Sequence, residues 1–325
     1  MPMPSSPFTV AIIVAYHPNL ADLNQLIEVT SAQVGRVIIV DNSPSSSDAL
    51  PELCASEKAK YVKLGENMGI AYAQNIGIEF AVKQKADYIL LLDQDSMPEE
   101  RMVERLLLGI TDSQNSLPNI IAAGPQYYDP RTNFQSLFIV SKFKIPFRYR
   151  PEKKILPSNV VFASFLISSG TLIDLHKLIE LCGMRSDYFI DHVDTEWCLR
   201  ALAKGYQLIG IHDAKMIHSL GDKAKKFWFF GMRNISEHTP LRDYYMFRNT
   251  LLLLKDVTIS FTWRIFLLFR LAEFFIFFLI FSKERTLRFN LMILGLRHGY
   301  SNIRGRLDLK TLMCDPIAPT SMDPT

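Results

Sequence analysis

This sequence of 325 residues has few cysteines, a small net charge and little that resembles a signal peptide. Its four cysteines form no Cys-x-x-Cys pair and have no zinc-finger spacing, which excludes that class of metal site and favours a reducing, cytoplasmic compartment. The formal net charge of only +3 gives no support to a nucleic-acid-binding function, so we expect no nucleic acid partner. The N-terminal segment lacks a basic region, and its apolar run Val10–Ala15 is too short for a secretory signal.

Long uncharged apolar runs are also missing. The segment Ile259–Ser282 is rich in Phe, Leu and Ile, but Arg264, Arg270 and Glu273 interrupt it. Its longest uncharged run, Phe274–Ser282, falls well short of the ~20 residues that a membrane-spanning helix needs. An interrupted apolar segment followed by basic residues is typical of a helix lying on a membrane surface, and packing on the rest of the chain or on a second subunit is the alternative. We predict attachment to the inner face of the cell membrane.

The sequence does contain a regular alternation of short apolar runs and helical segments. Strands are predicted at Phe8–Ala15, Arg36–Asp41, Lys60–Leu64, Tyr88–Asp93 and Ile120–Gly124, with helices between them. This alternation is typical of βαβ units, which form a mostly parallel sheet with helices on both faces. We therefore predict an α/β fold.

Two carboxylates, Asp93 and Asp95, stand at the end of the apolar run that begins at Tyr88. Open α/β sheets bind ligands at the carboxyl ends of their strands, where both acids can face one pocket. Two like charges so close together raise one pKa unless a cation lies between them, and hard oxygen ligands suit Mg²⁺ or Mn²⁺. The alternative is an acidic turn that caps a helix beginning near Met97 and Pro98.

A second acidic cluster lies further along the chain. Asp191, His192, Asp194 and Glu196 fall within one loop and the start of a helix. Helix capping explains one or two acids of this cluster and leaves Asp191 and His192 unexplained. Two acidic clusters suit a reaction in which one holds a metal and the other provides a general base. His218, which ends a further strand-like run, is a candidate metal or diphosphate ligand or a structural histidine.

In this order along the chain, the motifs resemble the family 2 glycosyltransferases with a GT-A fold, and within them the bacterial rhamnosyltransferase-like group. The resemblance covers roughly residues 9–255. Each motif is weak on its own, but their order makes a strong signal. The matching motifs are Val40-Asp41-Asn42, Asn67-Met68-Gly69 with Asn75-Ile76-Gly77, Leu92-Asp93-Gln94-Asp95, Ser169-Gly170-Thr171, the run from Phe189 to Arg200, His218, Tyr244-Tyr245 and Arg248-Asn249.

The resemblance implies an inverting, metal-dependent transfer of a sugar from a nucleotide diphosphate donor. The donor it implies is dTDP-L-rhamnose, with galactofuranose or a hexose from a UDP donor as alternatives. The implied acceptor is a glycan or a lipid-linked acceptor in the synthesis of bacterial cell-surface polysaccharide, such as O-antigen or capsule. The implied GT-A catalytic domain covers residues 1–240, with a nucleotide-sugar half to about 125 and an acceptor half beyond it. A helical, membrane-surface extension with a flexible tail covers 241–325.

The resemblance also assigns roles to individual residues. Donor binding falls to Tyr16, Asp41, Asn67, Gly69 and Asp93, metal binding to Asp93, Asp95 and His218, and acceptor binding to Ser169, Gly170, Glu196 and Arg248.

The general base is assigned by position. Many relatives carry Glu-Asp where this chain has Val193-Asp194, and counting back from Arg200 makes Asp194 the base. Asp191 is extra and is the alternative base. We expect Asp194 at the junction of loop and helix, where the helix dipole lowers its pKa, and an ion pair between Glu196 and Arg200.

Three other functions account for parts of the pattern. A haloacid-dehalogenase-type phosphatase also has an Asp-x-Asp motif after an apolar strand, but on its opening strand, whereas here βαβ units precede the motif. A nicotinamide-dependent enzyme needs a Gly-x-Gly-x-x-Gly motif after the first strand, which this chain lacks. In a non-catalytic peripheral membrane protein the acids would only cap helices, and replacing Asp95 would leave partner binding intact.

Overall fold

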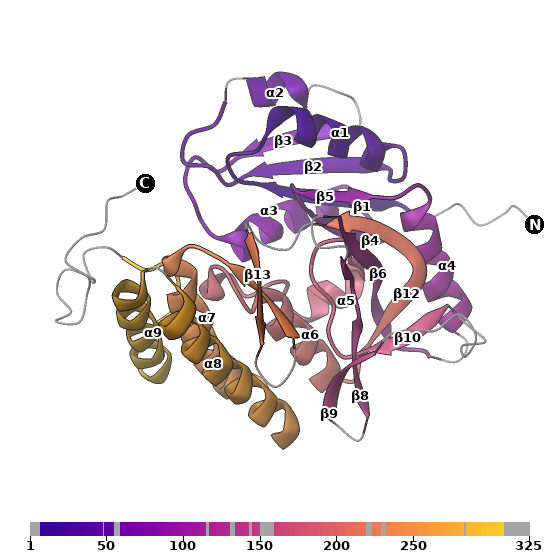
Figure 1. The fold of residues 1–325 in the computed structure, drawn as a ribbon. Coiled ribbons are helices and arrows are strands. Elements are labelled where there is room, and N and C mark those ends of the chain that lie inside the picture. The colour runs from indigo at the N-terminus through magenta and orange to yellow at the C-terminus, as the bar shows by residue number, and fades with distance from the viewer. Residues whose placement is uncertain are drawn as a thin grey trace, which may run out of the picture.

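A ten-stranded mixed sheet runs through the computed structural model (Figure 1). The structure describes residues 7–47, 49–54, 59–114, 117–130, 134–142, 145–149, 159–218, 223–228, 232–282 and 284–308. Its main strands, in spatial order, are β10 (Val160–Ala163), β12 (Gln207–His218), β6 (Ile120–Asp129), β11 (Leu172–Asp174), β4 (Tyr88–Asp93), β1 (Thr9–Ala15), β2 (Arg36–Asp41) and β3 (Ala59–Lys63). Strands β4, β1, β2 and β3 form parallel pairs, as do β6 and β12. The predicted α/β fold is confirmed.

Strand β11 breaks the parallel order, and the sequence pattern does not predict it. It pairs antiparallel with β4 on one side and with β6 on the other. A strand of three residues is too short to show the period of two by which strands are recognised.

The chain after Asp95 forms a strand, not the start of a helix. This strand, β5 (Ser96–Pro98), pairs antiparallel with the end of β12 and places Ser96 opposite His218. The helix expected near Pro98 therefore begins later, as α4 (Met102–Gln114).

Alternate side chains of the central strands enter two apolar cores, one on each face of the sheet. On β1, Val10 and Ile12 belong to the first core, and Ala11 and Ile13 to the second. All four are fully buried, as expected for a strand covered on both faces. The first core includes α3 (Ile70–Lys83), α5 (Leu175–Glu180) and α6 (Val193–Ala203), and the second includes α1 (Leu20–Ser31), α2 (Ala49–Leu53) and α4.

Three C-terminal helices pack together at one side of the molecule (Figure 1). They are α7 (Pro240–Asp256), α8 (Phe261–Phe281) and α9 (Arg285–Tyr300). Helix α9 approaches α7 closely because Gly295 and Gly299 have no side chain. A Cβ at Gly295 would lie 2.5 Å from the Tyr244 carbonyl oxygen, and one at Gly299 would lie 2.7 Å from that of Arg248.

The C-terminal helices also share packing with the sheet. Leu252 and Leu253 of α7 belong to the same core as α3 and α6, so the domain boundary at residue 240 stays a prediction. The tail that we expect to be flexible lies, beyond residue 308, outside the described residues. In the described part of the chain, no helix combines the length and the apolar character needed to cross a membrane.

The smaller elements are β7 (Phe134–Gln135), the hairpins β8 (Phe138–Lys142) with β9 (Ile145–Tyr149) and β13 (Lys223–Trp228) with β14 (Met232–Glu237), and the 3₁₀ turn η1 (Ser186–Tyr188).

Candidate active site

Three loops meet at the carboxyl edge of the sheet, where the sequence predicts the ligand site. The sheet register places Asp41, at the end of β2, and Asp93, at the end of β4, on either side of the end of β1. The Tyr16 N–H donates to Oε1 of Gln94 (2.7 Å), and Nε2 of Gln94 donates to the Tyr16 carbonyl (3.0 Å). These two hydrogen bonds tie the loop after β1 to the Asp93-Gln94-Asp95 loop.

The structure brings Asp93, Asp95 and His218 together. One ligand atom from each lies within 4.8 Å of the others. Nδ1 of His218 is 2.9 Å from the Ser96 hydroxyl and 3.5 Å from Oδ1 of Asp95. The antiparallel pairing of β5 with β12 sets this arrangement, because it brings a residue far along the chain to the end of β4.

The charges of these residues fit a divalent cation. Burial raises the pKa of Asp93, and the neighbouring Asp95 carboxylate raises it further, against the opposing effects of His218 and Arg242. A cation between the two carboxylates removes this repulsion. Two carboxylates and an imidazole are a donor set that suits Mg²⁺ or Mn²⁺.

Asp41, the predicted nucleoside contact, is fully buried at the end of β2. Its carboxylate accepts hydrogen bonds from the Ser43 N–H (3.0 Å) and from the Tyr61 hydroxyl (2.8 Å). Burial raises the pKa of Asp41, but the hydrogen bonds outweigh burial and lower it. Asp41 is therefore a carboxylate at neutral pH, and it shapes the loop after β2.

Asn67 and Gly69 connect this side of the site to the second acidic cluster. Oδ1 of Asn67 accepts hydrogen bonds from the Gly69 N–H and from Asn42, each at 3.1 Å. Gly69 has a φ of 86°, and a Cβ there would lie 2.6 Å from the Phe189 carbonyl oxygen, so this position requires glycine. The start of α3 thus packs directly on the loop before α6.

Asp194 lies in the first turn of α6, and the N-cap is His192. Its Oδ1 accepts a hydrogen bond from the Thr195 N–H (2.7 Å), and no hydrogen bond to Oδ2 is found within the described ranges. Burial raises the pKa of Asp194 to about 6, and the charges of Asp93 and Asp191 add to the effect. The lowered pKa expected from the helix dipole is therefore wrong, because desolvation outweighs the dipole at a buried carboxylate.

Arginines neutralise the other two acids of the cluster. Asp191 accepts hydrogen bonds from the Arg242 guanidinium at 2.6 and 3.2 Å. Glu196 is fully buried and pairs with Arg200 at 2.7 Å, so the predicted ion pair is confirmed. This gives Glu196 a structural position, and its predicted acceptor contact stays a prediction. Among the described residues, Asp194 is the acid of the cluster with no cation at ion-pair distance.

The loop before α6 has an unusual backbone. Phe189, Asp191 and His192 have φ angles of 65°, 62° and 60°. Left-handed conformations cost non-glycine residues about 1 kcal/mol or more each, so contacts from elsewhere must hold this loop.

Asn249 of α7 supplies those contacts. Its Nδ2 donates to the carbonyl oxygens of Tyr188 (2.9 Å), Ile190 (2.7 Å) and Asp191 (2.9 Å). The neighbouring Arg248 is fully buried and donates to the Tyr188 carbonyl (3.0 Å) and to the Gly305 carbonyl. The guanidinium of Arg248 thus supports the loop through its backbone, and the predicted acceptor contact of Arg248 stays a prediction.

Ser169 and Gly170, which are also predicted to bind the acceptor, form hydrogen bonds with the backbone at the end of β4. The Ser169 hydroxyl accepts a hydrogen bond from the Asp93 N–H (3.0 Å), and the Gly170 N–H donates to the Leu91 carbonyl (2.7 Å). Both residues are buried. An acceptor contact for either residue stays a prediction.

Comparison with known proteins identifies the family. A family model described as Glycosyl transferase family 2 matches residues 11–168. The dTDP-rhamnosyl transferase RfbF of Shigella flexneri is 36% identical over 251 residues, which are 75% of this chain and 79% of that protein. This chain is a family 2 glycosyltransferase. The predicted resemblance is confirmed.

Solved structures share the fold of this glycosyltransferase. Residues 1–349 of S. aureus TarS, in complex with UDP-GlcNAc, are 13% identical with a TM-score of 0.56, and the match covers 91% of this chain and 81% of that one. GalNAc-T7 with UDP, GalNAc and Mn²⁺ is 12% identical with a TM-score of 0.52, and the match covers 66% of this chain and 43% of that one. At these identities the likeness concerns the fold alone.

Two residues of the glycosyltransferase site are absent from the sequence-based prediction. Arg242 binds Asp191, and its charge lowers the pKa of Asp93, so it links the two acidic clusters. Tyr127 stands edge-on to His218, with ring centroids 5.8 Å apart. Neither belongs to a motif with fixed spacing, and the signal that could have found Arg242 is its place just before the Tyr244-Tyr245 motif.

Replacing Asn249 tests its hold on the loop. Asn249→Ala removes the donor to three carbonyls, so the acids shift, and we expect turnover to fall about a hundredfold while donor binding changes little. Steady-state kinetics and calorimetric donor titration measure the two effects, and circular dichroism checks folding. Asn24→Ala, which removes an exposed side-chain hydrogen bond to Glu28 on α1, is the control. Undiminished turnover in Asn249→Ala would show that the loop does not need this donor.

Replacing Asp95 tests the cation site. The Asp95 side chain is 51% exposed, so Asp95→Asn should fold normally, yet bind Mn²⁺ at least ~10-fold more weakly because a charged oxygen ligand is lost. Calorimetric titration with Mn²⁺ measures this, and we expect turnover to fall at least ~100-fold. Asp112→Asn, at an exposed position of α4, is the control. Full wild-type activity in excess chelator contradicts the prediction.

Proposed function

We propose that this glycosyltransferase transfers L-rhamnose from dTDP-L-rhamnose to a glycan or lipid-linked acceptor of a bacterial cell-surface polysaccharide, with inversion at the anomeric carbon. The observation that carries the proposal is the 36% identity to a dTDP-rhamnosyl transferase across 79% of that protein. A divalent cation at Asp93, Asp95 and His218 is part of the proposal.

The protonation states in the second acidic cluster support Asp194 as the general base. A base near neutral pH works best when its pKa is close to the working pH, and the pKa of Asp194 is raised to about 6 by burial. The Arg242 ion pair makes Asp191 the weaker candidate, because both of its carboxylate oxygens already accept hydrogen bonds from the guanidinium. In the proposed reaction, Asp194 takes the proton of the acceptor hydroxyl as that oxygen attacks the sugar.

In the proposed reaction, the residues near the leaving diphosphate differ from those near the acceptor hydroxyl. A bound cation would supply charge neutralisation on the leaving diphosphate. Arg242 adds positive charge next to Asp93, on the side of the site where Asp191 lies. With one base and one direct displacement, the configuration at the anomeric carbon inverts.

The membrane attachment of the C-terminal helices also stays a proposal. Helix α8 exposes Phe261, Ile265 and Phe269, each at least half exposed, as an interfacial helix would. A cytoplasmic protein held on the inner face of the membrane would meet both a soluble donor and a lipid-linked acceptor.

A panel of donors tests the proposed function. We expect the purified protein to hydrolyse or transfer from dTDP-L-rhamnose at least ~10-fold faster than from UDP-hexoses and UDP-galactofuranose, since a pocket with polar contacts to one sugar and base discriminates strongly. Product detection by mass spectrometry measures the ratio. A faster rate with a UDP donor would replace the proposed donor.

The general base has a pH signature. Because only ionised Asp194 accepts a proton, we expect kcat/KM to rise about tenfold per pH unit below pH 6 and to level off above it, with a bound cation moving the midpoint lower. Asp194→Asn should bind donor normally, transfer ~10²–10⁴-fold more slowly and lose this pH dependence. Asp191→Asn is the comparison variant. If it shows that behaviour while Asp194→Asn stays active, the base is Asp191.

A further inference from the structure

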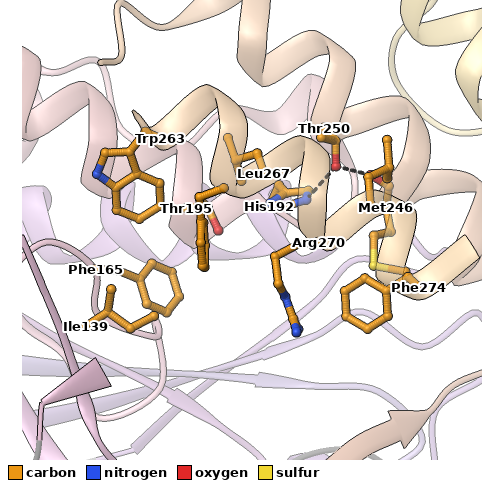
Figure 2. A pocket seen from close by; sticks show the side chains of 12 residues that line it. Ile139, Phe165, His192, Thr195, Met246, Thr250, Trp263, Leu267, Arg270 and Phe274 are labelled. Carbon is orange, nitrogen blue, oxygen red and sulfur yellow. Dashed lines mark hydrogen bonds between the residues drawn. The ribbon is translucent and has the colours of Figure 1, made fainter. Parts of the chain in front are cut away.

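We propose that the cavity between α8 and the loop before α6 binds the hydrocarbon chain of a lipid-linked acceptor. We call it the α8 cavity, and its volume is about 160 Å³. Figure 2 shows Ile139 and Phe165 on one side of it, and Trp263, Leu267 and Phe274 of α8 on the other. The inference rests on the proposed function, because it names the part of the acceptor that the same site would hold.

The α8 cavity lies next to the proposed base. His192 and Thr195 line it, and they flank Asp194 in the sequence. The Thr195 N–H donates to Asp194 Oδ1 at 2.7 Å, so the wall of the cavity and the base share one turn of helix. The α8 cavity therefore lies beside the turn of α6 that carries the proposed base.

The polar groups in the wall are already bonded to one another. The Thr250 hydroxyl donates to the Met246 carbonyl (2.8 Å), so it accepts the hydrogen bond from Nε2 of His192 (2.9 Å), which fixes the tautomer of His192 (Figure 2). Burial lowers the pKa of His192, which keeps the ring neutral. Its Nδ1 is shielded on all sides, so a group that enters the cavity does not reach it.

The positive charge in the lining is paired with a carboxylate outside it. Arg270, which lines the α8 cavity, pairs with Glu273 of the same helix at 2.6 Å, and its guanidinium lies 4.6 Å from the Phe274 ring centroid. A sugar ring buried here would lose water from several hydroxyls without new partners, which costs more than its contacts return. A hydrocarbon chain meets no such cost and gains contact with the aromatic walls.

Helix α8 suits an occupant longer than the cavity. Phe266 lines the α8 cavity, and Phe269, one turn further on, is 50% exposed. The apolar surface of the helix therefore continues outward from the wall. We therefore expect the enzyme to prefer acceptors in which the hydrocarbon chain is attached close to the sugar that is modified. Long glycans, in which many sugars separate the modified sugar from the lipid, should be poorer acceptors.

Paired acceptors test this inference by activity. Sugars are offered as methyl and as octyl glycosides below the micellar concentration, with dTDP-L-rhamnose as donor. Each buried methylene improves affinity about fourfold, so we expect the octyl glycoside to have a KM at least ~10-fold lower. Leu267→Trp, which fills the cavity, should abolish the difference. Leu268→Trp is the matched control, because Leu268 is exposed on the same helix and does not line the cavity.

A binding measurement separates this inference from the proposed function. Trp263 lines the α8 cavity and is one of three tryptophans, so an octyl glycoside brominated near the chain end should quench its fluorescence. Quenching should be absent in Trp263→Phe, weakened at least tenfold in Leu267→Tyr and unchanged in Leu268→Tyr, two variants that add no tryptophan. If Leu267→Trp or Leu267→Tyr fails to fold by circular dichroism, the same replacement of Ile139 fills the cavity from the opposite wall.

The outcomes decide each proposal independently. Quenching at Trp263 without sugar transfer from any donor overturns the proposed function and leaves the hydrocarbon site standing. Equal KM values for methyl and octyl glycosides in the wild type overturn the hydrocarbon site. So does quenching that Leu267→Tyr and Leu268→Tyr reduce equally, because the chain would then bind the outer surface of α8.

Discussion

The left-handed backbone of the loop before α6 is the constraint on which the rest of the site depends. Phe189, Asp191 and His192 all have positive φ, and the loop keeps that shape because Asn249 bonds three of its carbonyls. Asn249 is placed in turn by α7, which is held by the close approach of α9 at Gly295. The backbone of the loop before α6 thus depends on helix packing near the C-terminal end of the described chain.

Four carboxylates lie near one another at this site, and their electrostatic environments differ. Asp191 is neutralised by Arg242, whereas Asp194 is half-buried, has no cation at ion-pair distance among the described residues and has a raised pKa. Asp93 and Asp95 oppose each other and so provide a place for a cation. Because the acids differ in environment, one cluster can hold a metal while the other accepts a proton.

The sequence was sufficient to predict the parallel strands and both acidic clusters, because long buried runs and acids at strand ends follow local rules. It could not reveal β11 or β5, whose three residues each show no periodicity. It also could not show that Arg248 and Glu196 are buried, since both residue types are usually exposed and only tertiary packing decides. The pKa of Asp194 was mispredicted for a similar reason: the helix dipole is visible in sequence, whereas desolvation is not.

Residues close to the end of the described chain contact the turn before α6, and this bears on the order in which the protein folds during its synthesis. The Gly305 N–H donates to the Asp187 carbonyl (2.7 Å), and Arg304 forms ion pairs with Asp187 and Asp256. Chains fold from the N-terminus as they leave the ribosome, so the nucleotide-sugar half can form long before residue 305 emerges. Until then the turn at Asp187, just before the loop that Asn249 holds, lacks its hydrogen bond to Gly305 and its ion pair with Arg304, so residues close to the end of the described chain complete the support of this region.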